Sequence, residues 1–150
     1  MHDIKKILVP TDFSKDTVRI LDTAALIARK FGAVIHLVFV VESLDAYAGF
    51  AVPHPSLENL EKDLLNRAKG KMEEFIAGLP KALTPHHNVI LNGKVPEQII
   101  NYADIEECDL IVIGTRACKE VHRTLFGSVT ERVIRTATCP VLSMNPCPEG

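Results

Sequence analysis

The sequence lacks a long apolar run. None of its apolar runs approaches the roughly 20 residues that a membrane span requires. The first apolar run covers only residues 7–9 and follows an acidic start, so no signal-peptide core is predicted. Basic residues are not in excess either: the formal net charge is −2 and the isoelectric point lies near 6.3. That balance argues against general nucleic-acid binding, which usually shows a basic stripe. We therefore expect a cytoplasmic protein that binds neither membranes nor nucleic acid.

Metal-binding patterns are also missing. The four cysteines, Cys108, Cys118, Cys139 and Cys147, fall at spacings that match no zinc motif, and the six histidines show no metal-ligand spacing. Cys108 and Cys139 flank expected strands and are predicted to be small core residues. Cys118 lies in a basic loop, where it is more often a bystander than a reactive thiol. His36 interrupts an apolar strand and is predicted to be a core or edge histidine instead of a ligand.

What the sequence does contain is an alternation of apolar runs and helical periods over its 150 residues. This alternation is typical of βαβ units and predicts one α/β domain, residues 1–150. Its expected core is an open five-stranded parallel sheet, doubly wound and Rossmann-like, with helices on both faces. The expected strands cover residues 4–10, 34–41, 87–91, 110–113 and 140–144. The expected helices cover residues 16–31, 56–79, a segment from Pro96, and 127–137, and residues 43–55 are expected to be a loop. The first helix is expected to stop at Gly32 with Phe31 on its buried face. The second is expected to have Ser56 as its cap and Leu60 in its core stripe.

Ligands of open α/β sheets bind beyond the carboxyl ends of the strands. Three expected strand ends carry polar or glycine residues there: Pro10-Thr11-Asp12, Val40-Val41-Glu42 and Gly114-Thr115-Arg116. An aspartate after a strand forms a turn or caps a helix as often as it binds a ligand. Both roles therefore remain open for Asp12.

The stretch of residues 114–133, "GTRACKEVHRTLFGSVTERV", carries a more specific signal. Ser128 and Glu131 have the spacing of a capping box, so the last helix is predicted to start at Gly127-Ser128. A helix start offers unpaired N–H groups and a partial positive charge, which suit a phosphate. Arg116, Lys119, His122 and Arg123 lie between the two glycines. A capped helix after a solvated basic loop is the alternative, and the phosphate site is favoured over it.

These residues carry a resemblance to the universal stress protein family. "KKILVPTDFS" resembles the first strand of that family, "GKVPEQIINYADIEECDLIVIGT" its third helix and fourth strand, and "LFGSVTERVIRTATCPVL" its final helix and strand. Members that bind ATP carry a glycine, two residues, a second glycine, nine residues, then Gly-Ser or Gly-Thr. Here Gly114, Ala117, Gly127 and Ser128 stand at these positions, so every spacing matches and one glycine is replaced.

The resemblance implies an adenine nucleotide α-hydrolase-like fold and a stress-response regulatory protein that binds ATP or AMP, with any Mg²⁺ arriving with the nucleotide. It implies that Asp12 contacts the adenosine and that the Val41 backbone meets the adenine edge. Gly114 and Arg116 would line the ribose and phosphates, and Ser128, Val129 and Thr130 would hold the phosphates. The full predicted site is Pro10, Thr11, Asp12, Val41, Gly114, Thr115, Arg116, Ala117, Gly127, Ser128, Val129 and Thr130.

Ala117 is the departure from the family pattern. If the family glycine has positive φ, alanine costs roughly 1–2 kcal/mol there, which lowers affinity on the order of 5- to 30-fold. The alternative is therefore a stress protein that binds no nucleotide and acts through protein contacts. An adenylating enzyme is disfavoured because "PTDFSKD" contains no glycine, and a receiver domain because Asn92-Gly93 and Asn145-Pro146 replace its acceptor Asp and its Lys.

No motif places a catalytic base, so we expect a binding protein and not an enzyme. The fifth expected strand is apolar at Val141, Leu142 and Met144, and no acid or lysine lies among residues 139–144. An exposed edge strand of this kind invites pairing with another chain, and family members are similar in using it. The sequence therefore predicts a homodimer formed through the fifth strand.

Overall fold

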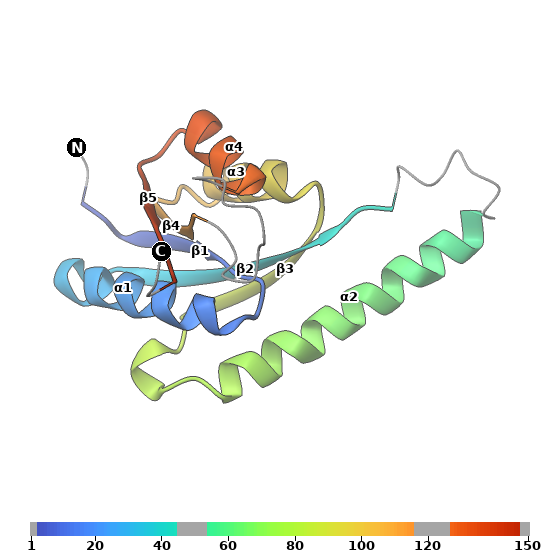
Figure 1. The fold of residues 1–150 in the computed structure, drawn as a ribbon, viewed down its shortest axis with the longest axis horizontal. Coiled ribbons are helices and arrows are strands. Elements are labelled where there is room, and N and C mark those ends of the chain that lie inside the picture. Colours follow the sequence, from blue (N-terminus) through green and yellow to red (C-terminus); the bar gives the residue numbers. More distant parts are fainter. Residues whose placement is uncertain (1–2, 45–53, 116–126, 148–150) are drawn as a thin grey trace.

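The computed structural model describes residues 3–44, 54–115 and 127–147, in which strands and helices alternate as the sequence predicts (Figure 1). The elements are β1 Lys6–Pro10, α1 Lys15–Phe31, β2 Val34–Glu42, α2 His54–Ala77, the short 3₁₀ helix η2 Lys81–Leu83, β3 His87–Gly93, α3 Val95–Ile105, β4 Leu110–Gly114, α4 Ser128–Thr136 and β5 Val141–Met144. No helix in these three segments is long and apolar enough to cross a membrane.

The strands form one sheet in the order β3-β2-β1-β4-β5, and every neighbouring pair is parallel. The chain moves outward from β1 through β2 to β3, then returns to place β4 on the other side of β1. The order therefore reverses between β1 and β4, which is where ligands bind in open sheets. The predicted doubly wound α/β fold is confirmed.

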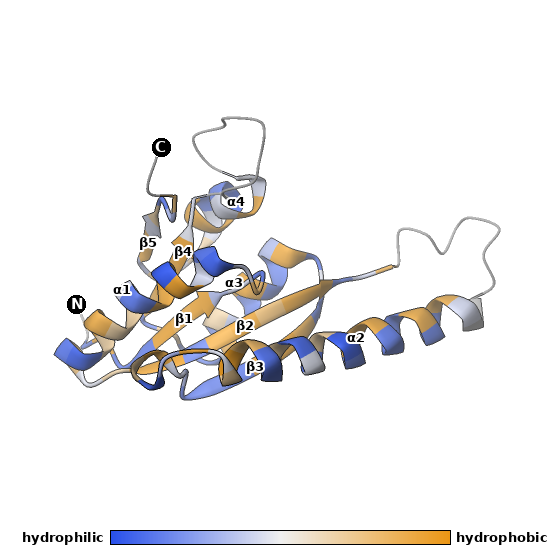
Figure 2. Ribbon diagram, turned by 60° about the horizontal axis from the view of Figure 1, so that its bottom comes forward, coloured by the Kyte–Doolittle hydropathy of each residue, from blue (hydrophilic) through white to orange (hydrophobic). Residues whose placement is uncertain are grey.

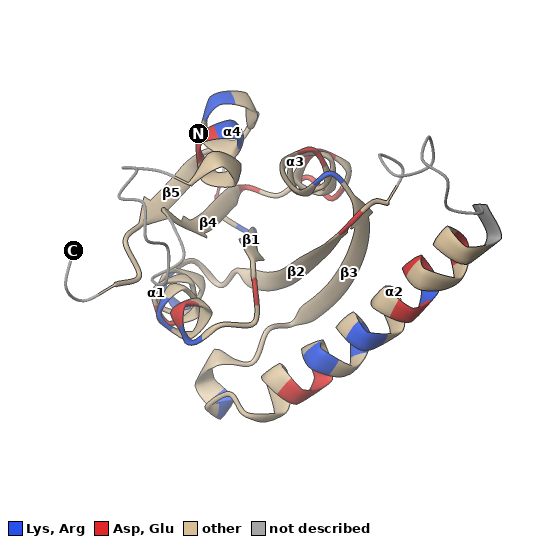
Figure 3. Ribbon diagram, turned by 45° about the vertical axis from the view of Figure 1, so that its right-hand side comes forward, with Lys and Arg blue, Asp and Glu red and all other residues tan. Residues whose placement is uncertain are grey.

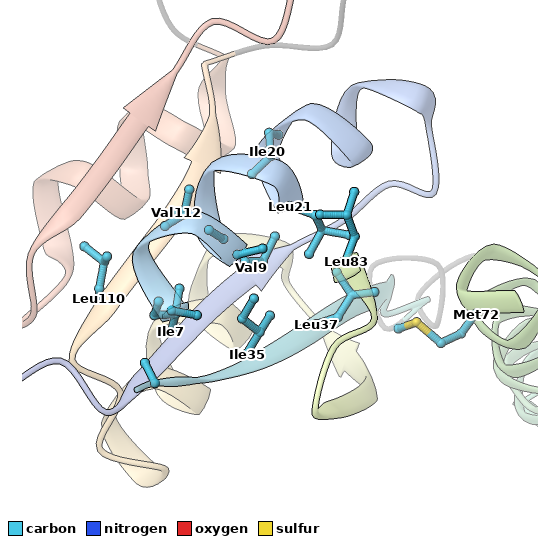
Figure 4. Close-up of a cluster of buried hydrophobic side chains, with 14 residues drawn as sticks. Ile7, Val9, Ile20, Leu21, Ile35, Leu37, Met72, Leu83, Leu110 and Val112 are labelled. Atoms are coloured by element: carbon cyan, nitrogen blue, oxygen red, sulfur yellow. The ribbon is translucent and has the colours of Figure 1, made fainter. Parts of the chain in front are cut away.

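Helices cover both faces of the sheet, with α1 and α2 on one side and α3 and α4 on the other (Figure 1). Ile7 and Val9 of β1 pack with α1 in the first core layer, which also contains Met72 and Leu83 (Figure 4). Leu8, between them, packs against α3 and α4 in the second layer. Successive strand residues point to opposite faces. A strand buried on both faces therefore reads as a continuous apolar run, as β1 does (Figure 2).

The end of α1 follows from one glycine. Gly32 adopts φ 68°, and its N–H donates to the carbonyl of Ala28. This left-handed conformation is nearly free of cost only for glycine. The predicted stop at Gly32 is confirmed, whereas Phe31, predicted on the buried face, lies in the last turn of α1 and is 55% exposed.

The long helix α2 differs from its prediction in two ways. It begins at His54, so Ser56 is inside the helix and not its cap; Pro55 fits the first turn because the N–H it lacks would be unpaired there anyway. Its 24 residues span about 36 Å, whereas the seven residues of the edge strand β3 span about 23 Å. The helix therefore extends past the sheet, with charged side chains along much of it (Figures 1 and 3), and Leu60, predicted in the core, is 47% exposed.

The histidine and cysteines of the core lie on the α3 face. His36 is buried, and its Nδ1 lies 2.7 Å from the Tyr102 hydroxyl, as expected for a core histidine. Burial, with a smaller contribution from neighbouring His87, lowers the pKa of His36. Cys108 is buried and Cys139 packs against the same layer, so both core predictions are confirmed. Burial raises the pKa of the Cys108 thiol to about 12, so it stays protonated at neutral pH.

Candidate functional site

A cavity of 260 Å³ opens at the carboxyl ends of β1 and β4, the point at which the strand order reverses. Eight predicted site residues line it: Pro10, Thr11, Asp12, Gly114, Gly127, Ser128, Val129 and Thr130. The remaining lining residues are Asp16, Thr17, Ile20, Val95, Ile99 and Ile113. The fold thus brings the end of the first strand beside the start of the last helix.

The loop after β1 is held by a turn centred on Asp12. Its Oδ1 accepts a hydrogen bond from the Ser14 N–H at 2.9 Å and one from the Thr17 hydroxyl at 3.3 Å. Asp12 therefore forms the turn, which is one of the two roles that the sequence left open for it. The side chain is nevertheless exposed at the cavity wall, so the second role, binding a ligand, is compatible with the first.

Phe13, the next residue, adopts φ 64°. For a side chain this large the left-handed conformation costs roughly 1–2 kcal/mol. Its ring stacks on Phe39 with centroids 4.4 Å apart and lies 5.9 Å from the ring of Phe75, while its N–H donates to Thr11 Oγ1 at 2.8 Å. These contacts offset the strain and fix the loop that carries Asp12.

The start of α4 corrects one prediction. The residue before the helix is Gly127, with φ −66° and ψ 154°, and no side chain of the described residues caps the helix. Ser128 is the first helical residue and does not act as the cap, so the predicted capping box is wrong. Glu131 instead pairs with Arg135 one turn later. The reason is tertiary: the Gly127 N–H donates to the Thr115 carbonyl at 2.5 Å, which places Gly127 at the entry to the helix.

The backbone at this helix start is available to an anion. The Glu131 N–H donates to the Gly127 carbonyl at 2.9 Å, so the N–H groups of Ser128, Val129 and Thr130 have no partner within the helix. The partial positive charge of the helix dipole is concentrated on them. Thr130 fixes their position, because its hydroxyl donates to the Gly114 carbonyl at 2.6 Å.

The same cavity has an apolar part, with Ile20, Ile99 and Ile113 in its wall. Gly114 allows Ile20 to approach the end of β4: a Cβ on Gly114 would lie 2.9 Å from Ile20 Cδ1. The site therefore combines hydrogen-bond donors at a helix start with a hydrophobic surface. That combination suits a ligand with an anionic end and a flat apolar end.

Four predicted residues lie outside this cavity or outside the described residues. Val41 is buried near the end of β2 and does not line the cavity, since β1 separates β2 from β4 in the sheet. Thr115 contributes the carbonyl that receives the Gly127 N–H but is not part of the wall. Arg116 and Ala117, like Cys118, lie outside the described residues.

Six wall residues were absent from the sequence prediction. Asp16 and Ile20 on α1, and Val95 and Ile99 on α3, are pairs spaced by four residues. This spacing places each pair on one face of its helix. The sequence contains that signal, but it does not say that these faces meet at the end of β4.

A second and larger cavity, of 740 Å³, lies beyond the ends of β2 and β3. Its wall contains Glu42, Glu61 and Glu97, with Lys94 as its cation. This cavity borders the start of α3, but Pro96 there has no N–H to donate and Glu97 adds a carboxylate to the first turn. The start of α4 offers three N–H groups to the smaller cavity, which is therefore the better anion site. Among the residues that the structure describes, no group of three or more His, Cys, Asp or Glu side chains is placed to hold a metal ion.

Comparison with known proteins gives a consistent result. The model of the "Universal stress protein family" matches residues 3–144. Universal stress protein MJ0531 of Methanocaldococcus jannaschii is 32% identical over 143 residues, covering 92% of this chain and 80% of the relative. The solved structure of the hypothetical protein MJ0577 has a TM-score of 0.80 and 28% identity, covering 96% of this chain and 97% of that one.

Two more distant structures share the fold and were solved with adenine nucleotides. A universal stress protein in complex with cAMP has a TM-score of 0.61 and 20% identity, covering 97% of this chain and 100% of that one. The protein from Archaeoglobus fulgidus in complex with dAMP has a TM-score of 0.52 and 24% identity, covering 95% and 98%. At these identities the likeness shows the fold alone.

Proposed function

Because the chain belongs to the universal stress protein family, we propose that it binds an adenine nucleotide, ATP or AMP, in the cavity between β1, β4 and α4, as part of a stress-response role. The observation that carries the proposal is that Asp12 shares one cavity with the start of α4, whose first three N–H groups have no partner within the helix. Family proteins of this fold in complex with cAMP and dAMP support the ligand class.

The residues present fit such a ligand. The N–H groups of Ser128, Val129 and Thr130 would bind the phosphates, and the isoleucine wall would pack against the base. Asp12 would accept hydrogen bonds from the ribose, because a carboxylate is an acceptor only. Any Mg²⁺ would come with the nucleotide. We propose binding without turnover, since no motif of the sequence places a catalytic base.

Ala117 supports the second candidate, a family member that acts through protein contacts without nucleotide. One chromatographic analysis of the nucleotide released from the denatured protein separates the two candidates. We expect ATP or AMP in the released fraction. Ala117→Gly should then tighten nucleotide binding in calorimetry, because it restores the glycine of the ATP-binding pattern.

Thermal unfolding with added nucleotide is the direct test. Ligand at 100 times its dissociation constant adds about 2.7 kcal/mol to the free energy of unfolding, so ATP with Mg²⁺ should raise Tm and GTP should raise it less.

Gly127→Val should abolish the increase in Tm that ATP causes, because a branched side chain would fill the space through which the phosphates approach. Its φ of −66° is allowed for valine, and each Tm shift is measured from the variant's own unliganded Tm, so loss of stability does not mimic loss of binding. No shift at millimolar ATP would favour the protein-contact candidate.

A homodimer through β5 and a cytoplasmic location stay predictions. In the described part of the chain β5 has one sheet neighbour, β4, and Leu142 is 37% exposed. Together with Val141 and Met144 it presents an apolar edge that a second copy would cover.

A further inference from the structure

Thr17 in the first turn of α1 is part of a directed chain of hydrogen bonds that ends on Asp12. The Phe13 N–H donates to Thr11 Oγ1 at 2.8 Å, and the Thr11 hydroxyl donates to Thr17 Oγ1 at 3.0 Å. The Thr17 hydroxyl then donates to Asp12 Oδ1 at 3.3 Å. Each hydroxyl has a single proton to give, so the chain runs in one direction and its last acceptor is the carboxylate.

Thr17 is 2% exposed and lies in the wall of the cavity. A buried hydroxyl is costly unless it is hydrogen-bonded, and an apolar residue of the same size would fill this place without that requirement. What the hydroxyl adds is the link between Thr11 and Asp12. Its burial also keeps water from competing for the bond to Asp12.

The two oxygens of Asp12 are therefore unequal. Oδ1 receives the Ser14 N–H and the Thr17 hydroxyl, whereas Oδ2 receives no hydrogen bond from the residues that the structure describes. With Oδ1 fixed from two directions, rotation of the carboxylate is restricted. Oδ2 then has a defined place at the rim of the cavity.

We propose that Thr17 is a positioning residue, which orients Asp12 so that Oδ2 accepts from the ribose hydroxyls of the nucleotide. This inference rests on the proposed function and deepens it. It requires discrimination between ribonucleotides and nucleotides that lack these hydroxyls. Removing the Thr17 hydroxyl must reduce this discrimination, whereas it would leave the discrimination unchanged if Thr17 served packing alone.

The test compares ATP with 2′,3′-dideoxy-ATP in calorimetry on the full chain. Thr17→Val keeps the shape and removes the donor, and should weaken ATP about tenfold, as expected for a hydrogen bond to a charged group. Dideoxy-ATP should change by less than about twofold, because it has no hydroxyl for Oδ2 to accept. Thr17→Ser should restore the preference for ATP. Thr23→Val, on the same helix but outside this cavity, is the matched control and should change neither affinity.

Three results would overturn the inference. Equal losses for the two nucleotides in Thr17→Val would show general damage to the site, and unchanged ATP affinity would show that Thr17 positions nothing. A wild type that binds both nucleotides equally would refute the ribose contact while leaving nucleotide binding intact, whereas a wild type that binds neither would refute the proposed function itself. If Thr17→Val fails to fold, Thr17→Ala removes the same donor without a branched side chain and should show the same selective loss for ATP.

Discussion

Gly114→Ala would place a methyl group where a side chain of α1 already packs. The new Cβ would lie 2.9 Å from Ile20 Cδ1, and 3.5 Å from Cγ of Pro146. The second distance is ordinary contact, but the first is too short for two carbon atoms. Gly114 shows no positive φ, so the backbone accepts alanine and the clash with Ile20 is the effect that remains.

The magnitude follows from the burial of Ile20, which is 5% exposed. Its Cδ1 is the end of a side chain that lines the cavity and can turn toward it, so the cost should be about 1–2 kcal/mol, the lower part of the range for overpacking. Ile20→Val removes Cδ1 and by itself costs about 0.5–1.5 kcal/mol. In the Ile20→Val background Gly114→Ala should then cost less than about 0.5 kcal/mol, because its closest neighbour is absent.

Urea unfolding of the wild type, the two single variants and the double variant measures this coupling. We expect the double variant to be more stable than the sum of the single effects by about 1–2 kcal/mol. Effects that add within about 0.5 kcal/mol would refute the reasoning. They would show that Ile20 is not the residue that excludes a side chain at position 114.

Further predictions concern other parts of the structure. Thr130→Val should cost about 1–3 kcal/mol in urea unfolding, because it leaves the Gly114 carbonyl without its buried donor, whereas Thr130→Ser should stay near wild type; equal costs would contradict the hydrogen bond. Burial lowers the pKa of His36, so its imidazole binds a proton more readily in the unfolded chain than in the folded protein. The stability contributed by the neutral His36 side chain is therefore present above the unfolded pKa and is lost as the pH falls below about 6.5. The stability difference between wild type and His36→Val should therefore shift in favour of the variant between pH 7.5 and pH 5.5, and a pH-independent difference would rule the effect out. Leu142→Lys should convert a dimer into a monomer in light scattering at micromolar concentration, and a wild-type monomer would disprove the β5 interface.

Much of the fold was predictable because its signals are local. The run of residues 7–9 has the pattern of a strand buried on both faces. The first strand ends at Pro10 as predicted, and the fourth ends at Gly114, one residue beyond its predicted end. Gly32 ends the first helix because it adopts a left-handed φ, a property of that residue alone. The spacing from Gly114 to Gly127-Ser128 identified the family, and the matched family model confirms it.

Errors arose where a segment depends on something distant. The capping box at Ser128 was plausible from spacing, but a hydrogen bond from Gly127 to Thr115 sets the helix start. Leu60 had the period of a core residue, but the helix that carries it is longer than the sheet beneath it.

The sequence by itself determined which residues form strands, where the chain turns and which family the protein resembles, because periodicity, glycine conformation and short motifs act over a few residues. Only the tertiary structure decided that Asp12 and Thr17 share one cavity with the start of α4, and that Val41 lies outside it. The strand order β3-β2-β1-β4-β5 is the reason, since it places β4 beside β1 and leaves β2 on the opposite side of β1 from β4. Strand order depends on the packing of both helix layers at once, which no local pattern encodes.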